Sequence, residues 1–110
     1  MYMNIAKLLG QSSPNAATLT ALYQAPACAC TTANTLMVCN RSGVATTFRV
    51  AVAPKAEVDA VKHYLYYDHA LGANATHTAA LDLRLGENDE VRVYAAAATV
   101  SFSLFGVETL

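Results

Sequence analysis

The stretch Val61–Leu71, "VKHYLYYDHAL", gathers His63, His69, Asp68 and three tyrosines within eleven residues. Histidine beside a carboxylate can act in general acid–base catalysis, and two histidines with a further ligand can hold zinc. In an extended strand, however, His63 and His69 would lie about 20 Å apart, which is too far to bind one metal ion. We therefore interpret the stretch as a β-strand rather than as a complete active site.

Side chains alternate between the two faces of a strand, so this stretch has one face with both leucines, which we expect to be buried. That face holds His63, Leu65, Tyr67, His69 and Leu71, and the other holds Lys62, Tyr64, Tyr66 and Asp68. Tyr64 and Tyr66 then form an amphipathic patch, which favours contact with another protein. Ordinary cross-strand packing on a half-exposed sheet is the alternative for these two side chains.

His77 is the third histidine, on the next expected strand. A turn at Gly72–Asn74 would place His69 and His77 nearly opposite one another. Two histidines still need a third ligand or an acid to form a metal or catalytic site. We interpret them as core or rim histidines with hydrogen-bonded rings.

The three cysteines, Cys28, Cys30 and Cys39, have C-x-C spacing at the first pair. Structural zinc takes four ligands, with cysteines commonly paired as C-x₂₋₄-C, so the pattern does not favour zinc. Residues two apart on an extended chain are also too distant for a disulfide. We expect reduced thiols that act as small buried hydrophobic residues, and no metal or other cofactor.

No motif for nucleophilic catalysis or phosphate binding occurs in the sequence, which has neither a G-x-S-x-G elbow nor a Gly-rich phosphate loop. The acidic residues of the connections are expected to be solvated turn residues: Glu57, Asp59, Glu87, Asp89 and Glu90. The sequence is not that of an enzyme.

Composition describes a charge-poor chain of 110 residues, a length that suits one domain. Charged residues make up 14%, against roughly a quarter in an average soluble domain. The seven basic residues are scattered and the net charge is −1, so we expect no nucleic-acid partner. The charge-free run 8–40 is broken by Pro14 and Pro26, so we expect no membrane span, and no signal peptide is evident at the start. A surface short of charge indicates that part of it lies inside an assembly.

Apolar alternation at period two predicts an all-β fold. Seven strands are expected, at Thr18–Gln24, Asn34–Asn40, Thr46–Pro54, His63–Leu71, Ala75–Leu83, Glu90–Ala95 and Thr99–Glu108. Lys55–Lys62 is expected to form one or two helical turns that cross between sheets. Seven to eight short strands separated by turns favour an antiparallel β-sandwich, either a jelly roll or immunoglobulin-like.

The first residues differ from the rest of the chain, because "GQSSPNAA" has no strand pattern. We expect residues 1–17 to be an extended N-terminal arm and residues 18–110 to be the sandwich domain. Ile5, Leu8 and Leu9 of "NIAKLL" could add a strand to a partner. The predicted partner contacts are therefore Ile5, Leu8, Leu9, Tyr64 and Tyr66.

From about Thr18 onward, the chain resembles small β-sandwich structural proteins of tailed bacteriophages and prophages. The resemblance rests on "TLTALYQAPA", "MVCNRSGVATTFRVAVAP", "KHYLYYDHALGANAT" and "LGENDEVRVYAAAATVSFSLFGVE". It implies a non-enzymatic virion protein made in the bacterial host cytoplasm, without a cofactor. Capsid decoration (a cement protein) is slightly favoured over a neck, tail or fibre component. The implied partners are its own copies, in a trimer or ring, and the major capsid protein or tail and neck proteins.

A carbohydrate- or receptor-binding module is the alternative function, with Tyr64 and Tyr66 as a stacking platform. Sugar sites usually combine several aromatic side chains with amides and carboxylates in one groove. The sequence contains no tryptophan, which counts against this alternative.

Overall fold

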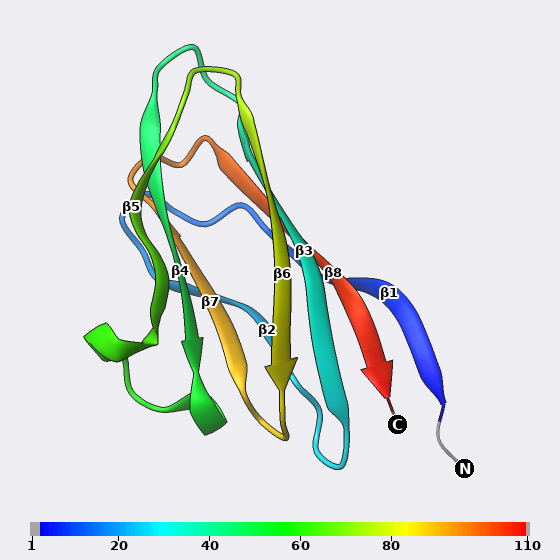
Figure 1. Cartoon of the computed structure of the whole chain (residues 1–110). Helices are drawn as coiled ribbons and strands as arrows, with labels where there is room; N and C mark the ends of the chain where they lie inside the picture. Colours follow the sequence, from blue (N-terminus) through cyan, green and yellow to red (C-terminus); the bar gives the residue numbers. More distant parts are fainter. Residues whose placement is uncertain (1–2, 110) are drawn as a thin grey trace.

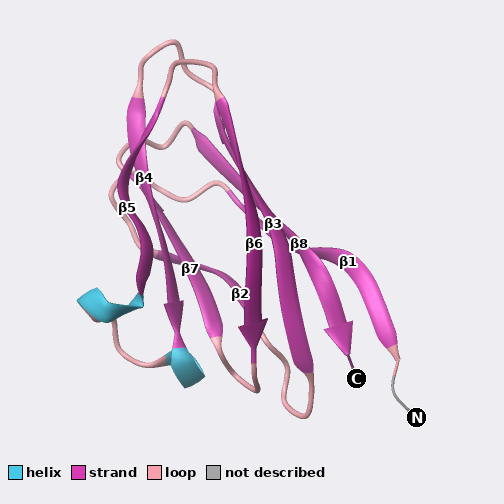
Figure 2. Cartoon of the chain, viewed as in Figure 1, coloured by secondary structure: helices cyan, strands magenta, loops and turns pink. Residues whose placement is uncertain are grey.

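Two four-stranded antiparallel sheets face one another in the computed structural model, which describes residues 3–109 (Figure 1). The first sheet has the strand order β1-β8-β3-β6, and the second has the order β2-β7-β4-β5. The strands are β1 (Asn4–Ser12), β2 (Thr20–Gln24), β3 (Cys30–Asn40), β4 (Thr46–Ala53), β5 (Tyr64–Leu71), β6 (Thr76–Leu85), β7 (Glu90–Ala95) and β8 (Val100–Thr109). Two short 3₁₀ turns, η1 (Pro54–Ala56) and η2 (Val61–His63), complete the regular structure of this part of the chain (Figure 2).

The strand pairing is nested along the chain. β1 pairs with β8, β2 with β7, β3 with β6 and β4 with β5, all antiparallel. The chain is thus one long hairpin that is rolled until its two ends meet, and the eight strands divide between two sheets. This is a jelly roll, so the predicted antiparallel β-sandwich is confirmed.

The connections between strands differ from the sequence-based expectation. β4 and β5 are neighbours in the second sheet, so the segment between them does not cross between sheets, as had been predicted. The chain instead crosses at the turn after Leu71, because β5 lies in the second sheet and β6 in the first. Turn residues specify that the chain reverses, but not whether the flanking strands pair with each other.

Residues 4–12 also differ from expectation, since they form the edge strand β1 instead of a free arm. β1 pairs with β8 from Asn4 opposite Thr109 to Ser12 opposite Phe102. A β-bulge between Leu8 and Gly10 breaks the alternation, which explains why the sequence pattern did not reveal a strand. The expected arm is therefore part of the sandwich over these residues.

The core between the sheets consists mainly of short aliphatic side chains. The largest fully buried apolar residues are Phe48, Phe102, Leu36, Leu104, Val38, Val50, Val91, Val93 and Val100. Gly10 closes one side, since a Cβ atom there would overlap the backbone carbonyl oxygen of Leu22. β1 and β2 can therefore approach closely only because residue 10 is glycine.

Asn40, which is 1% exposed, joins three connections at one end of the sandwich. Its amide nitrogen donates to the carbonyl oxygens of Val44 (2.9 Å) and Gly72 (3.0 Å). Its side-chain oxygen accepts hydrogen bonds from Ser42 N and Thr99 Oγ1, both at 3.1 Å. The connections before β4, β6 and β8 are thus held by one satisfied buried amide.

We predict that Asn40→Ala lowers the free energy of unfolding by about 2–3 kcal/mol, because buried polar groups lose their partners. Urea denaturation followed by circular dichroism measures the change. Asn34→Ala is the matched control, because Asn34 lies on the same strand and is exposed. It should change stability by less than about 0.5 kcal/mol. Equal effects of the two substitutions would contradict the structural role of Asn40.

Candidate functional site

His63 is buried at the end of η2, as predicted, but it lies outside the strand. Its Nδ1 accepts a hydrogen bond from Ala60 N (3.3 Å), so Nε2 carries the proton and donates to Glu57 Oε1 (3.3 Å). Both ring nitrogens are therefore used to hold the connection between β4 and β5. This arrangement is structural, and it places His63 apart from the other two histidines.

A β-bulge in β5 reverses part of the predicted facing. Tyr66 lies opposite Val50 and His69 lies opposite Phe48, so two residues, Tyr67 and Asp68, share the space opposite one residue of β4. Asp68 has a positive φ of 50°, which aspartate tolerates better than most residues. Tyr66 consequently packs against the core, whereas His69, predicted to lie on the buried face, is exposed.

The exposed fractions follow from the bulge. Leu65 and Tyr67, predicted to be buried, are 48% and 59% exposed, whereas Leu71 is buried as predicted. Tyr66, predicted to be on the outer face, packs against the core. The alternation rule was wrong here because it assumes an unbroken strand.

His69 and His77 come together across the gap between the sheets, with ring centroids 4.8 Å apart. Tyr66 and Phe48 pack against both histidines, with centroid distances from 5.2 to 5.7 Å. The Nε2 atom of His77 is buried without a hydrogen-bond partner, so the predicted hydrogen-bonded rings are wrong for this atom. Within residues 3–109, no group of three or more His, Cys, Asp or Glu residues is placed to hold a metal ion.

The cysteines are not buried, in contrast to the prediction. Cys28 and Cys30 are exposed and Cys39 is half-buried, all as free thiols. Cys28 lies in a turn with φ 61°, and Cys39 faces outward from β3 opposite Ser101. Their positions follow from strand facing, which the C-x-C spacing does not determine.

Tyrosine and arginine side chains stack on the outer side of the second sheet. The Arg49 guanidinium lies 4.1 Å from the ring centroid of Tyr67 and 4.3 Å from that of Tyr94. It also donates to both carboxylate oxygens of Asp68, at 2.6 and 3.3 Å. Because Arg49 already occupies a face of each ring, these tyrosines are poorly disposed to stack on a sugar.

Ion pairs continue over the same side of the second sheet. Arg92 pairs with Glu90 and with Asp59 of the connection between β4 and β5. The carboxylate of Asp89 accepts hydrogen bonds from Lys55 N (3.0 Å) and Gly86 N (2.8 Å). The acidic residues predicted to be solvated therefore also fasten the connections to the sheet.

The outer side of the first sheet is different, because its outward positions on β1, β3 and β8 carry no charged side chain in the described part of the chain. Neighbouring strands align the outward residues in rows: Leu8, Phe105, Thr35 and Ala80; Gln11, Ser103, Met37 and Thr78; and Ala6, Val107 and Thr32. We call this surface the uncharged face. Asp82 and Arg84, 69% and 82% exposed, lie at its border on the edge strand β6.

Large apolar side chains occupy the centre of the uncharged face. Leu8, Met37 and Phe105 are 42%, 39% and 37% exposed. Serine and threonine hydroxyls surround them, so this surface can contact another protein without desolvating a charge. The arrangement favours association.

The structure places the five predicted contact residues in different environments. Leu8 lies on the uncharged face, whereas Leu9 and Tyr66 pack against the core. Ile5 is half-buried opposite Glu108, and Tyr64 is half-buried against Tyr67, with ring centroids 5.0 Å apart.

Met37 and Phe105 were missed by the sequence analysis. A signal for each was present, because "NTLMVCN" is apolar on both faces and Phe105 breaks the alternation set by Phe102 and Leu104.

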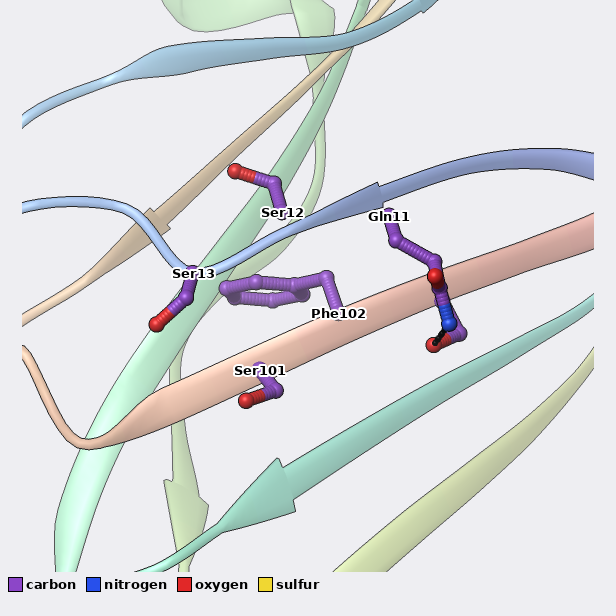
Figure 3. Close-up of a pocket in the computed structure, with 6 residues that line it drawn as sticks. Gln11, Ser12, Ser13, Ser101 and Phe102 are labelled. Carbon is purple, nitrogen blue, oxygen red and sulfur yellow. Dashed lines mark hydrogen bonds between the residues drawn. The ribbon is translucent and has the colours of Figure 1, made fainter.

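A hollow lies beside the uncharged face where β1 ends against β8. Its lining consists of Gln11, Ser12, Ser13, Ser101, Phe102 and Ser103. Figure 3 shows Ser12, Ser13 and Ser101 around the ring of Phe102, with Gln11 on the remaining side. Gln11 Nε2 donates to Ser103 Oγ at 3.2 Å. The lining is mainly hydroxyl groups, which can donate to or accept from a polar ligand.

Glu108 is a buried carboxylate that joins the two sheets. Tyr23 OH, from the second sheet, donates to Glu108 Oε2 (2.5 Å), and Lys7 Nζ donates to Oε1 (3.0 Å). These donors hold the pKa of Glu108 below its ordinary value of 4.5. Burial and the neighbouring carboxylate raise the pKa of Tyr23 to about 12. Tyr23 also bonds Thr31, so the group is a closed structural network.

Comparison with known proteins found no similar family model, curated protein or solved structure. No helical segment within residues 3–109 is long and apolar enough to cross a membrane.

We predict that the free energy of unfolding falls as the pH decreases below 4.5, through the lowered pKa of Glu108. In that range the unfolded chain binds a proton that the folded chain does not, so protons favour unfolding. Urea denaturation from neutral pH to about pH 3 tests this, with Glu108→Gln expected to remove part of the pH dependence. Asp82→Asn, at an exposed carboxylate, is the control and should leave it unchanged. The same pH dependence in Glu108→Gln as in the wild type would contradict the assignment.

Proposed function

We propose that this protein is a non-enzymatic structural protein that assembles with its own copies through the uncharged face. The observation that carries the proposal is the unequal distribution of charge. Ion pairs and cation–aromatic contacts lie over the second sheet, while the centre of the first sheet presents Leu8, Met37 and Phe105.

A second copy is the occupant that this surface fits best. Two uncharged faces can meet without repulsion between like charges and without burying an unpaired ion. A surface of four strands over about eight residues covers about 500 Å² per copy at ordinary strand spacing, so a pair would bury about 1,000 Å². That is at the lower end for specific interfaces, which suits an assembly where several contacts act together.

The proposal extends to a virion component, and the support for this step is the sequence resemblance to small β-sandwich phage proteins. Jelly rolls serve as viral capsid domains, and also as lectin domains and cupins, so the fold is compatible with the proposal without selecting it. Capsid decoration remains slightly favoured over a neck, tail or fibre role. The carbohydrate-binding alternative required Tyr64 and Tyr66 as an open stacking platform, and the packing of Tyr66 against the core and of Tyr64 against Tyr67 weighs against it.

We predict that Phe105→Asp weakens self-association at least tenfold, because it places a charge at the centre of the contact. Sedimentation velocity over a range of concentrations measures the association. Val61→Asp is the matched control, since Val61 is an 88% exposed apolar residue outside the uncharged face. A wild-type chain that remains monomeric, or equal weakening by both substitutions, would overturn the proposal.

Mass spectrometry of purified particles from the phage that encodes the chain tests the virion step. A copy number near that of the major capsid protein would support decoration, and a few copies would support the neck, tail or fibre role. Absence from the particle would contradict a virion function.

A further inference from the structure

Arg41 differs from the other three arginines because it has no acidic partner. Arg49, Arg84 and Arg92 each pair with at least one carboxylate, while no ion pair among residues 3–109 includes Arg41. Its three hydrogen bonds go to neutral oxygens: Nε to Ser101 Oγ (2.9 Å), and Nη2 to Ser13 Oγ (3.0 Å) and to the carbonyl oxygen of Ala98 (3.1 Å). The guanidinium is held in place, but its charge is not neutralised.

The two serine oxygens occupy a position that an acid usually takes. Nε and Nη2 point to the same side of the guanidinium group and commonly bind the two oxygens of one carboxylate. Here Ser101 and Ser13 supply those oxygens, and both residues line the hollow beside the uncharged face. Arg41 therefore lies behind the hydroxyls of the hollow.

Acceptance of hydrogen bonds by these hydroxyls leaves their own protons free. Ser13 Oγ and Ser101 Oγ accept from Arg41, and Ser103 Oγ accepts from Gln11. Each hydroxyl has one proton to donate, and a nearby positive charge strengthens the donors of Ser13 and Ser101. Hydroxyl donors line the hollow, and an unneutralised guanidinium is hydrogen-bonded to two of them, so the hollow favours an anion with acceptor oxygens.

We propose that this hollow binds a carboxylate, presented by an acidic side chain of the protein that packs on the uncharged face. Gln11 and Ser103 belong to both surfaces, so a chain that covers the uncharged face reaches the hollow. The carboxylate oxygens accept from Ser13 and Ser101, and Arg41 supplies the compensating charge. This assignment of the partner rests on the proposed function, whereas carboxylate binding itself does not.

Acetate is the probe for the site. Amide chemical shifts of the folded chain are measured during a titration with sodium acetate, and in sodium chloride at equal ionic strength. Acetate should give saturable shifts at Ser12, Ser13, Arg41, Ser101 and Ser103. Shifts that do not saturate, or that chloride reproduces, would overturn the proposal, as would sulfate binding as tight as acetate binding.

Arg41→Gln should weaken acetate binding at least tenfold. Arg84→Gln is the control, because Arg84 is an exposed arginine on the same sheet and lies outside the hollow. Ser101→Ala keeps the guanidinium and removes one hydroxyl donor, so it should also weaken acetate binding. If Arg41→Gln does not fold, Ser101→Ala alone tests the site. Unchanged affinity in Ser101→Ala and in a folded Arg41→Gln would refute the site.

The source of the carboxylate is tested separately by self-association. Asp82 is the one carboxylate on the outer side of the first sheet within the described residues, so it is the candidate donor from a second copy. If it is the donor, Asp82→Asn and Arg41→Gln weaken association equally. If Asp82→Asn has no effect while Arg41→Gln weakens association, another acidic residue of the partner binds there. Acetate binding without any effect of Phe105→Asp on association would refute the proposed function but not the site.

Discussion

Close packing of two sheets across a core of short side chains is the constraint on which the rest of the structure depends. Most buried residues are valine, leucine or alanine, and Phe48 and Phe102 are the only fully buried aromatic side chains in the described chain. A small core contributes limited hydrophobic free energy, so the ends of the sandwich need specific polar contacts. Asn40 supplies them at one end, and the Tyr23–Glu108 network supplies a second link between the sheets.

The division of charge between the two outer surfaces follows from this architecture. The connection between β4 and β5 lies over the second sheet, and its Asp59 pairs with Arg92 of β7. Over the first sheet, the outward positions of β1, β3 and β8 carry no charged side chain within residues 3–109, and the charged residues Arg41, Asp82 and Arg84 lie at the margins. The scarcity of charged residues in the sequence is therefore concentrated on one surface, and that surface is suited to contact with another protein.

Irregularities in the strands account for most differences between expectation and structure. The bulge at Tyr67 and Asp68 turns Tyr66 into the core and Tyr67 outward, which removes the predicted tyrosine patch and allows Arg49 to stack. The bulge between Leu8 and Gly10 interrupts the alternation of side chains in β1, so the sequence pattern did not predict this strand. A bulge shifts every later side chain to the opposite face, so a single extra residue invalidates a correct local pattern.

The sequence by itself determined the all-β class, the positions of the seven later strands and most of the turns, because alternation and turn chemistry are local properties of the chain. Glu90–Ala95, for example, has the same bounds in the prediction and in the structure. Only the tertiary structure decided that residues 4–12 pair with β8, that the chain crosses between sheets after β5, and that Met37 and Phe105 share one surface. It also placed Arg41 beside Ser13 and Ser101, which are 28 and 60 residues away. Such groupings depend on which distant strands pair and in which register, and no local pattern encodes that choice.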